Sequence, residues 1–316
     1  MKKILIITIL FSLAACQKPR TSVNFAKAGL YPEGLEYDEK ADNFLVTSLS
    51  QGNVGKVTPD GKYSEFVKDD ELVSAIGIRI DRKNNRILVC NSDPGASVKT
   101  NKDTQGKKAG LGIYDLATGK KTSYIDLGAL NPDAGNFAND IALDDKGNIY
   151  VTNSFSPIIF QIGSDLKAKI FLQNDRFKGE GFGLNGIVYD EKGFLIVSKY
   201  NEGVLFKVPV NDPEKFTEVK LAEKIVGADG LLWGNNGNLI VNANASTNKS
   251  YEIKSKDNWE SAEIVNSIST GEVFVTTGVK TKHGIFILYS MLNKLFDPNN
   301  KVPAESFTIQ KLEFGK

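Results

Sequence analysis

The repeating unit of the chain is clearest in Gly183-Leu184-Asn185-Gly186-Ile187-Val188-Tyr189-Asp190-Glu191-Lys192-Gly193-Phe194-Leu195-Ile196-Val197-Ser198. It consists of a polar residue and a glycine, a run rich in β-branched and aromatic residues, a turn, and a second such run. Runs of this composition that are bounded by turn residues are typical of a β-hairpin.

This unit recurs along the chain at Gly34, Gly77, Asp140, Gly186, Gly230 and Gly278. The intervals are 43, 63, 46, 44 and 48 residues, and a period of about 40–50 residues is typical of radial or solenoid repeats. Each hairpin precedes segments suited to a third and a fourth strand, such as Val54–Thr58 with Tyr63–Val67 and Ile158–Ile162 with Ala168–Leu172. We therefore predict an all-β, six-bladed β-propeller with four-stranded blades and a central channel, rather than a β-sandwich with accidental hairpin similarity.

The composition is that of an ordinary soluble protein, with 41% hydrophobic and 24% charged residues. The net charge is only +1, and no basic run alternates with aromatic residues, so nucleic acid is not an expected partner. Because the repeat spans nearly the whole chain, we expect one propeller domain over residues 31–316.

The first sixteen residues are predicted to be a secretory signal. Lys2 and Lys3 precede an apolar run from Ile4 to Leu13, which small residues follow. The sequence Leu13-Ala14-Ala15-Cys16 resembles a bacterial lipobox. This resemblance implies lipidation of Cys16 and attachment to the membrane through that anchor only. Gln17, rather than an aspartate, follows the cysteine and favours the outer membrane, facing the periplasm.

Residues 17–30 are expected to form a tether. As an alternative, Ser22–Lys27 could add a strand to the last blade, beside or instead of Ser306–Leu312. The second cysteine, Cys90, lies in an apolar strand without a partner, so we expect a small buried hydrophobic residue rather than a reactive thiol.

The residue before each repeat glycine is the candidate functional position. The innermost strand of a blade starts near the propeller axis, so these residues should surround one mouth of the channel: Glu33, Ile76, Asn139, Asn185, Asp229 and Thr277. Five of the six carry a side-chain oxygen where packing alone would favour apolar residues. Such oxygens suit calcium or magnesium and can also bind zinc or manganese. Each residue taken alone could instead be an ordinary turn residue.

Four of these motifs resemble those that start the blades of the gluconolactonase and senescence marker protein family: Pro32-Glu33-Gly34, Phe137-Ala138-Asn139-Asp140, Leu184-Asn185-Gly186 and Ala228-Asp229-Gly230. The resemblance covers roughly residues 30–290. It implies one divalent metal ion, calcium in the first place, with Glu33, Asn185 and Asp229 as ligands. It further implies Asp229 as the general base and Asn139 as an amide that faces metal or substrate.

The chain departs from this family at Phe137, where the sugar-lactone enzymes often have a substrate-binding arginine. This departure favours a less polar or larger ligand. A mechanism with two histidines, as in related propellers, is excluded because His283 is the only histidine. We expect His283 to be a solvated turn residue.

The second strand of each blade should end on the same face as the candidate ring. The contacts predicted there come from Thr47, Ser48, Asn153, Ser154, Lys199, Tyr200, Asn242 and Asn244. The substrate-binding set is predicted as Phe137, Asn139, Asn153 and Lys199. The 63-residue interval also adds an insertion, from Asn91 to about Gly110, whose lysines could form a lid over an anionic ligand, with a solvated loop as the alternative.

The leading prediction is a divalent-metal-dependent hydrolase that acts on a lactone through metal-activated water in the central channel. No G-x-S-x-G, H-E-x-x-H or phosphate-loop motif is present, which disfavours serine, zincin and nucleotide chemistry. The alternative is a non-catalytic propeller, anchored to the bacterial envelope, that binds a metal and a small ligand.

Overall fold

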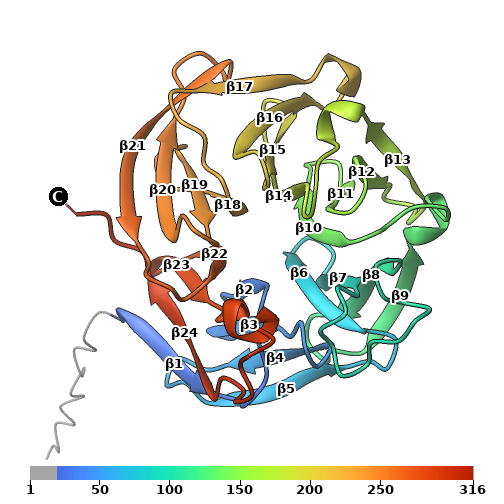
Figure 1. The fold of residues 1–316 in the computed structure, drawn as a ribbon, viewed down its shortest axis with the longest axis vertical. Coiled ribbons are helices and arrows are strands. Elements are labelled where there is room, and N and C mark those ends of the chain that lie inside the picture. The colour runs from blue at the N-terminus through green and yellow to red at the C-terminus, as the bar shows by residue number, and fades with distance from the viewer. Residues whose placement is uncertain (1–19, 316) are drawn as a thin grey trace, which may run out of the picture.

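The structure, a computed structural model, describes residues 20–315. Within this range the chain consists almost entirely of antiparallel strands, arranged as six four-stranded blades around a central axis (Figure 1). The predicted six-bladed β-propeller is thereby confirmed. The predicted signal peptide and Cys16 lie outside the described residues.

The first three blades follow one another directly along the chain, each from its innermost to its outermost strand. Blade 1 contains β2 (Leu35–Asp38), β3 (Asn43–Thr47), β4 (Asn53–Val57) and β5 (Tyr63–Lys68). Blade 2 contains β6 (Ser74–Asp81), β7 (Arg86–Ser92), β8 (Ala109–Asp115) and β9 (Lys121–Asp126). Blade 3 contains β10 (Ala138–Leu143), β11 (Ile149–Asn153), β12 (Ile158–Ile162) and β13 (Ala168–Gln173).

The last three blades repeat this order with one exception at the end of the ring. Blade 4 contains β14 (Leu184–Asp190), β15 (Phe194–Lys199), β16 (Val204–Pro209) and β17 (Thr217–Leu221). Blade 5 contains β18 (Ala228–Trp233), β19 (Leu239–Ala243), β20 (Lys249–Lys254) and β21 (Ser261–Ser269). Blade 6 contains β22 (Val275–Thr281), β23 (Gly284–Tyr289), β24 (Ser306–Lys311) and β1 (Ser22–Ala26).

Blades 4 and 5 share one hydrogen-bonded sheet of eight strands. Their outermost strands, β17 and β21, pair in parallel through Lys220↔Ser261 and Leu221↔Ala262. The hydrogen bonds therefore define five sheets, although the chain builds six blades.

The N-terminal strand closes the ring. Strand β1 pairs antiparallel with β24 over its whole length, from Ser22↔Gln310 to Ala26↔Ser306. Residues 22–26 are thus the outermost strand of blade 6, beside β24. The alternative of an added strand is confirmed, and the tether predicted over residues 17–30 is wrong for this part. The reason is burial, because Val23 and Phe25 are each only 2% exposed against the last blade.

The inner strands of the blades are more deeply buried than the outer ones. Strand β15, the second of blade 4, is buried along its whole length, whereas the outermost strands β9 and β13 expose much of their surface. This gradient follows from the radial packing of one blade against the next. Each fully buried valine, leucine or isoleucine contributes about 1.5–3 kcal/mol to such a core.

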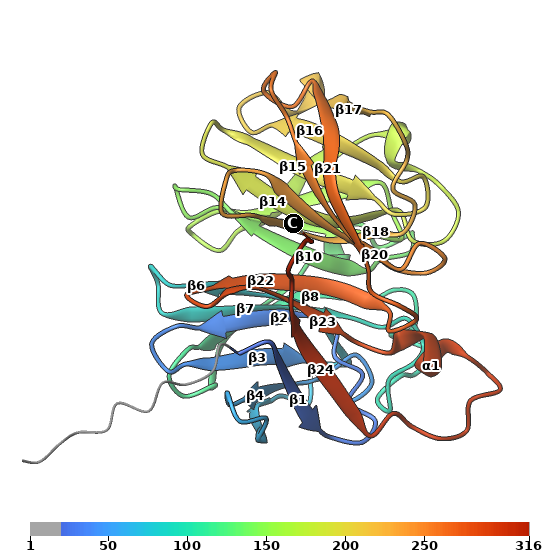
Figure 2. The same cartoon turned by 90° about the vertical axis from the view of Figure 1, so that its left-hand side faces the viewer.

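Helices are few and short. The described residues contain the 3-10 helices at Gly128–Leu130, Asp175–Phe177 and Pro213–Lys215 and one α-helix, α1 (Leu292–Phe296). Helix α1 lies between β23 and β24 and projects from one face of the propeller (Figure 2). None of these helices has the length and apolar character needed to cross a membrane.

Candidate functional site

A register shift in five of the six innermost strands lies at the predicted site positions. It falls between Ala138 and Ile141 in β10, between Leu184 and Ile187 in β14, and between Ala228 and Leu231 in β18, with equivalents in β6 and β22. A bulge of this kind turns a strand and redirects its side chains. Asn139, Asn185 and Asp229 each lie within such a shift.

The repeat glycine allows neighbouring blades to approach closely at the axis. A Cβ atom on Gly186 would lie 2.2 Å from the carbonyl oxygen of Asp229, and one on Gly77 would lie 2.3 Å from that of Asn139. Both distances are far below any real carbon–oxygen contact, so only glycine fits. The glycine of one blade therefore positions the site residue of the next.

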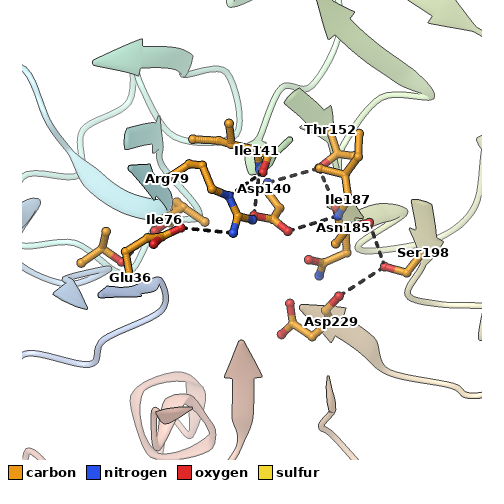
Figure 3. Close-up of polar contacts among 12 residues, drawn as sticks. Glu36, Ile76, Arg79, Asp140, Ile141, Thr152, Asn185, Ile187, Ser198 and Asp229 are labelled. Carbon is orange, nitrogen blue, oxygen red and sulfur yellow. Dashed lines mark hydrogen bonds and ion pairs between the residues drawn. The ribbon is translucent and has the colours of Figure 1, made fainter. Parts of the chain in front are cut away.

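Hydroxyl groups of neighbouring blades bind the backbone carbonyls of three site residues. The hydroxyl of Thr152 donates to the carbonyl oxygen of Asn185 at 2.6 Å, and that of Ser198 to the carbonyl oxygen of Asp229 at 3.3 Å (Figure 3). Across the closure of the ring, Thr276 donates to the carbonyl oxygen of Glu33 at 2.7 Å. These contacts hold the site residues on rigid strands.

The structure brings the predicted metal ligands together. Glu33, Asn139, Asn185 and Asp229, from four blades, line one small cavity on the axis with a volume of about 10 Å³. Each of these side chains is at most 8% exposed. A cavity of this size holds about one water-sized particle.

Three carboxylates line this cavity, those of Asp140, Glu33 and Asp229. Asp140 is paired with Arg79, which also lines the cavity, whereas Glu33 and Asp229 are poorly compensated. Burial raises the pKa of Glu33 well above its usual range, and the negative charges of Asp229 and Asp140 raise it further. Burial also raises the pKa of Asp229, although hydrogen bonds from Asn244 and Asn185 oppose this shift. No cationic side chain among the described residues offsets either carboxyl group.

The donor set fits a single hard cation. The side-chain oxygen of Asn185 is buried without a hydrogen-bond partner, and an unsatisfied buried oxygen beside two carboxylates is the arrangement that a bound cation would complete. No group of three or more Asp, Glu, His or Cys side chains that could hold a metal occurs in residues 20–315. A metal here would therefore depend on the amide oxygen of Asn185 as a third ligand.

Two further side chains orient Asp229. The amide Nδ2 of Asn244 donates to Asp229 Oδ2 at 2.5 Å, and the hydroxyl of Tyr200 donates to Asn244 Oδ1 at 2.6 Å. Both residues were predicted only as members of the rim. Their link to Asp229 requires the residues that follow β15 and β19 to meet, which the repeat pattern does not specify.

The four side chains of Glu33, Asn139, Asn185 and Asp229 form a polar ring around the axis. An apolar cavity lies above this polar ring, on the face that carries α1. Its volume is about 60 Å³, and besides Glu33, Asn139, Asn185, Tyr200 and Asp229 it is lined by Leu49, Phe137, Phe182, Phe274, Leu292 and Phe296. Phe137 packs against Phe155 and Phe182, with ring centroids 5.1 and 5.3 Å away. Phe137 and Asn139 thus both line this cavity, and α1 supplies two wall residues, Leu292 and Phe296, that sequence reasoning missed.

A substrate contact by Asn153 is contradicted by the structure. This residue is fully buried, and its Oδ1 accepts hydrogen bonds from the backbone N–H groups of Phe137, Phe155 and Ser156. Its Nδ2 donates to Asn136 Oδ1 at 2.8 Å. Both ends of the amide thus serve to hold the loops around the end of β11.

A substrate contact by Lys199 is contradicted as well. Its side chain is 1% exposed, and its ammonium donates to the carbonyl oxygens of Arg176 and Lys178 and to the carboxylate of Glu202. All three N–H donors are used. Lys199 therefore fastens the loops around it rather than facing the cavity.

The insertion between β7 and β8 does not form a lysine lid over the cavity. Asp93 is fully buried and accepts hydrogen bonds from Gly95, Thr100 and Thr104, which fold the loop on itself. The Lys99 ammonium donates to the carbonyl oxygens of Gly52, Asp69 and Leu72. No residue of this insertion lines the cavity beneath α1.

A buried ion-pair cluster below the ring was not predicted. Arg79 donates to Glu36 at 3.2 Å, approaches Asp140 at 3.5 Å, and donates through Nε to the carbonyl oxygen of Ile141 at 3.0 Å (Figure 3). Asp140 also accepts from the backbone N–H of Ile187 at 3.1 Å. One sequence feature could have pointed to this cluster: Asp140 takes the place of the repeat glycine in blade 3.

The remaining predicted residues take the structural roles expected of them. Cys90 is fully buried, and burial raises the pKa of its thiol well above the usual range. His283 is partly exposed in the turn between β22 and β23 and lies 3.9 Å from Asp42. Neither residue lines the site.

The fold is shared with solved proteins of low sequence similarity. The major allergen Mala s 1 of Malassezia sympodialis matches with a TM-score of 0.72 and 18% identity over 93% of this chain and 96% of that one. A luciferin-regenerating enzyme matches at 0.63 and 14%, over 93% and 96%. A protein with a provisional assignment as a gluconolactonase matches at 0.62 and 12%, over 92% of both chains.

At such identities the similarity establishes the β-propeller fold alone. The chain matches no family model, and no curated protein matches it by sequence.

Proposed function

We propose that this protein is a divalent-metal-dependent hydrolase of a lactone whose body is apolar. The observation that carries this proposal is that the polar groups of the site lie at the base of an apolar cavity, on the propeller axis. Two uncompensated carboxylates and an unsatisfied amide oxygen lie at the bottom of a cavity whose walls are aromatic and aliphatic. The cyclic ester would face the polar ring and its hydrocarbon part the walls.

The chain's own groups suit this reaction. Asn139 reaches both the polar ring and the apolar cavity, so its amide is placed to orient an ester carbonyl. Asn244 donates to Oδ2 of Asp229 and orients the carboxylate. A lone pair of this carboxylate that neither the amides nor the metal use would accept a proton from water as general base. The aromatic walls exclude bulk water and hold the ring of the substrate.

Glu33, Asn185 and Asp229 are the residues that would hold the metal. When bound, a divalent cation would polarise the ester carbonyl and lower the pKa of water. All-oxygen donors and a carboxamide ligand favour calcium over softer metals.

The test is hydrolysis of a lactone panel with calcium, zinc, manganese or magnesium, and with chelator. A lactone with a short alkyl substituent should be hydrolysed faster than a sugar lactone, and both chelator and Asp229→Asn should abolish turnover. Exposed Asp133 provides the matched control, because Asp133→Asn should leave the rate unchanged. Turnover that survives chelator would refute metal dependence.

The second candidate is a non-catalytic propeller that captures an apolar ligand at the same place. Phe137 favours it, because an aromatic wall residue stands where the lactonase resemblance leads one to expect a substrate-binding arginine. Metal binding with no hydrolysis of any lactone or ester would select this candidate.

We further propose that Cys16 is lipidated and anchors the propeller to the outer membrane, facing the periplasm. The support is the lipobox-like sequence alone. Membrane fractionation tests it: Cys16→Ser should move the protein into the soluble fraction, and an unchanged distribution would refute the anchor.

A further inference from the structure

A second cavity lies at the opposite end of the central channel. Its volume is about 280 Å³. The innermost strands of all six blades contribute to it, through Glu36, Arg79, Ile141, Val188, Trp233 and Val279 among others. These residues come later in each strand than the candidate metal ligands, so the two cavities occupy opposite ends of one axis.

The ion-pair cluster around Arg79 separates the two cavities. Arg79 lies between Glu36 of blade 1 and Asp140 of blade 3 and also contacts the backbone of β10 (Figure 3). Its side chain is 24% exposed and lines the second cavity. A guanidinium has five N–H donors, and three are used by these contacts, so two remain for a ligand.

The rim of the second cavity carries unpaired positive charge. Arg82 and Lys280 both line it and are exposed. Arg82 donates to the carbonyl oxygen of Tyr37 at 2.8 Å, but neither cation forms an ion pair in the part of the chain that the structure describes. With Glu36 the lining carries three positive charges and one negative charge, whereas the cavity beneath α1 carries only carboxylates.

The walls are apolar and fixed in place. Trp233 donates its indole N–H to the carbonyl oxygen of Tyr189 at 2.7 Å and packs edge-on against Trp259, with ring centroids 5.4 Å apart. Isoleucine, leucine and valine side chains from β10, β14, β18 and β22 also line the cavity. A preformed apolar cavity with a few converging polar groups is the usual form of a small-molecule site.

We propose that this cavity binds a small amphipathic carboxylate: an anion with a hydrocarbon body of one or two rings. The carboxylate would pair with Arg79, Arg82 and Lys280, and its body would lie against Trp233 and the aliphatic walls. The inference is independent of the function proposed for the opposite mouth, because it shares no catalytic residue with it.

The test is isothermal titration calorimetry with 2-naphthoate, with tryptophan fluorescence followed in parallel. We expect saturable binding that quenches the fluorescence of Trp233. The neutral analogue 2-naphthylmethanol should bind at least about tenfold more weakly, and the double variant Arg82→Glu/Lys280→Glu should weaken naphthoate binding by about tenfold or more, because two rim charges change sign.

Lys83→Glu is the matched control, since Lys83 is exposed beside Arg82 and does not line the cavity. It should bind naphthoate as the unmodified protein does, and circular dichroism should show that all variants fold. Three results would each overturn the proposal: no saturable binding at millimolar naphthoate, equal affinity for the neutral analogue, or unchanged affinity in the double variant.

Discussion

Asn244 holds Asp229 in one orientation across blade 5. Its Nδ2 donates to Asp229 Oδ2 at 2.5 Å and to the carbonyl oxygen of Val275 at 3.0 Å, while its Oδ1 accepts the hydroxyl of Tyr200. With all these contacts made, the amide cannot rotate without losing a buried hydrogen bond. The bond to Asp229 also favours the ionised carboxylate, the form that either a metal ligand or a general base requires.

Asn244→Ala should weaken calcium binding by about 10- to 100-fold, the range found when a residue that orients a metal ligand is removed. Calorimetric titration of the chelator-treated protein with calcium measures it. Tyr200→Phe, which removes only the hydroxyl that fixes Asn244, should have a smaller effect. Equal calcium affinity in Asn244→Ala and the unmodified protein would contradict the role of this hydrogen bond.

Glu33→Gln should abolish stabilisation by calcium without destabilising the metal-free protein. In the absence of metal, Glu33 is a buried carboxyl group beside Asp229 and Asp140, so a neutral amide of the same shape relieves repulsion. Calcium at about a hundred times its Kd should add about 2.7 kcal/mol to the free energy of unfolding of the unmodified protein and nothing to that of the variant. Urea unfolding with calcium or chelator measures both.

Glu36→Gln is the contrasting variant, because Glu36 is equally buried but paired with Arg79 at 3.2 Å. It should destabilise the protein and leave the response to calcium intact. If calcium still raised the free energy of unfolding of Glu33→Gln, Glu33 would not be a metal ligand.

The repeated glycine and its preceding residue were sufficient to predict the blades and the ring around the axis. Periodicity has this power because each blade presents the same backbone position to the channel. A glycine is needed there because the next blade lies so close that a Cβ atom on Gly186 would be 2.2 Å from the carbonyl oxygen of Asp229. The residues that line the cavity beneath α1 could not be predicted from the sequence to the same extent. Phe182, Phe274 and Phe296 come from loops and a helix outside the repeat, so no pattern assigns them to one cavity.

The errors have a common physical origin. Asn153 and Lys199 lie at the ends of second strands, as expected. The end of a strand determines the position of the backbone, but not the groups that the side chain contacts. Both side chains form hydrogen bonds with nearby backbone groups instead of facing the cavity. Asn153 accepts from three N–H groups, and Lys199 donates to two carbonyl oxygens. Which loops supply such groups depends on tertiary packing. The tether was misjudged for a similar reason, since Phe25 meets its partner Phe307 from the far end of the chain.

Arg79→Met should destabilise the protein by about 3–5 kcal/mol, the usual effect of leaving a buried charge without its partner. Glu36 and Asp140 would both lose their cation, and Arg79 is the charge that lowers the otherwise raised pKa of each. Guanidinium chloride unfolding measures the loss. Arg86→Met should have a smaller effect, because it leaves one carboxylate without its cation rather than two, and Asn84 still donates to the carboxylate of Asp81. Equal losses would argue against a central cluster in which Arg79 serves both Glu36 and Asp140.

Lys199→Met should lower stability by about 2–3 kcal/mol, because the carbonyl oxygens of Arg176 and Lys178 would lose their buried donor. Substrate turnover at 25 °C should stay the same within about twofold, since the side chain does not line the cavity. Thermal unfolding and initial rates on the best lactone measure the two quantities. A large rise in KM with unchanged stability would restore Lys199 to the substrate-binding set.

The same variant should change the response to acid. Lys199 and Arg176 lower the pKa of Glu202 from about 4.5 to about 2. A carboxyl group whose pKa is lower in the folded state stabilises the protein above the unfolded pKa, and this contribution is lost as the pH falls from near 4.5 toward 2. In Lys199→Met only Arg176 remains to lower that pKa, so stability should fall less steeply over this interval. An unchanged slope would show that Lys199 contributes through packing rather than charge.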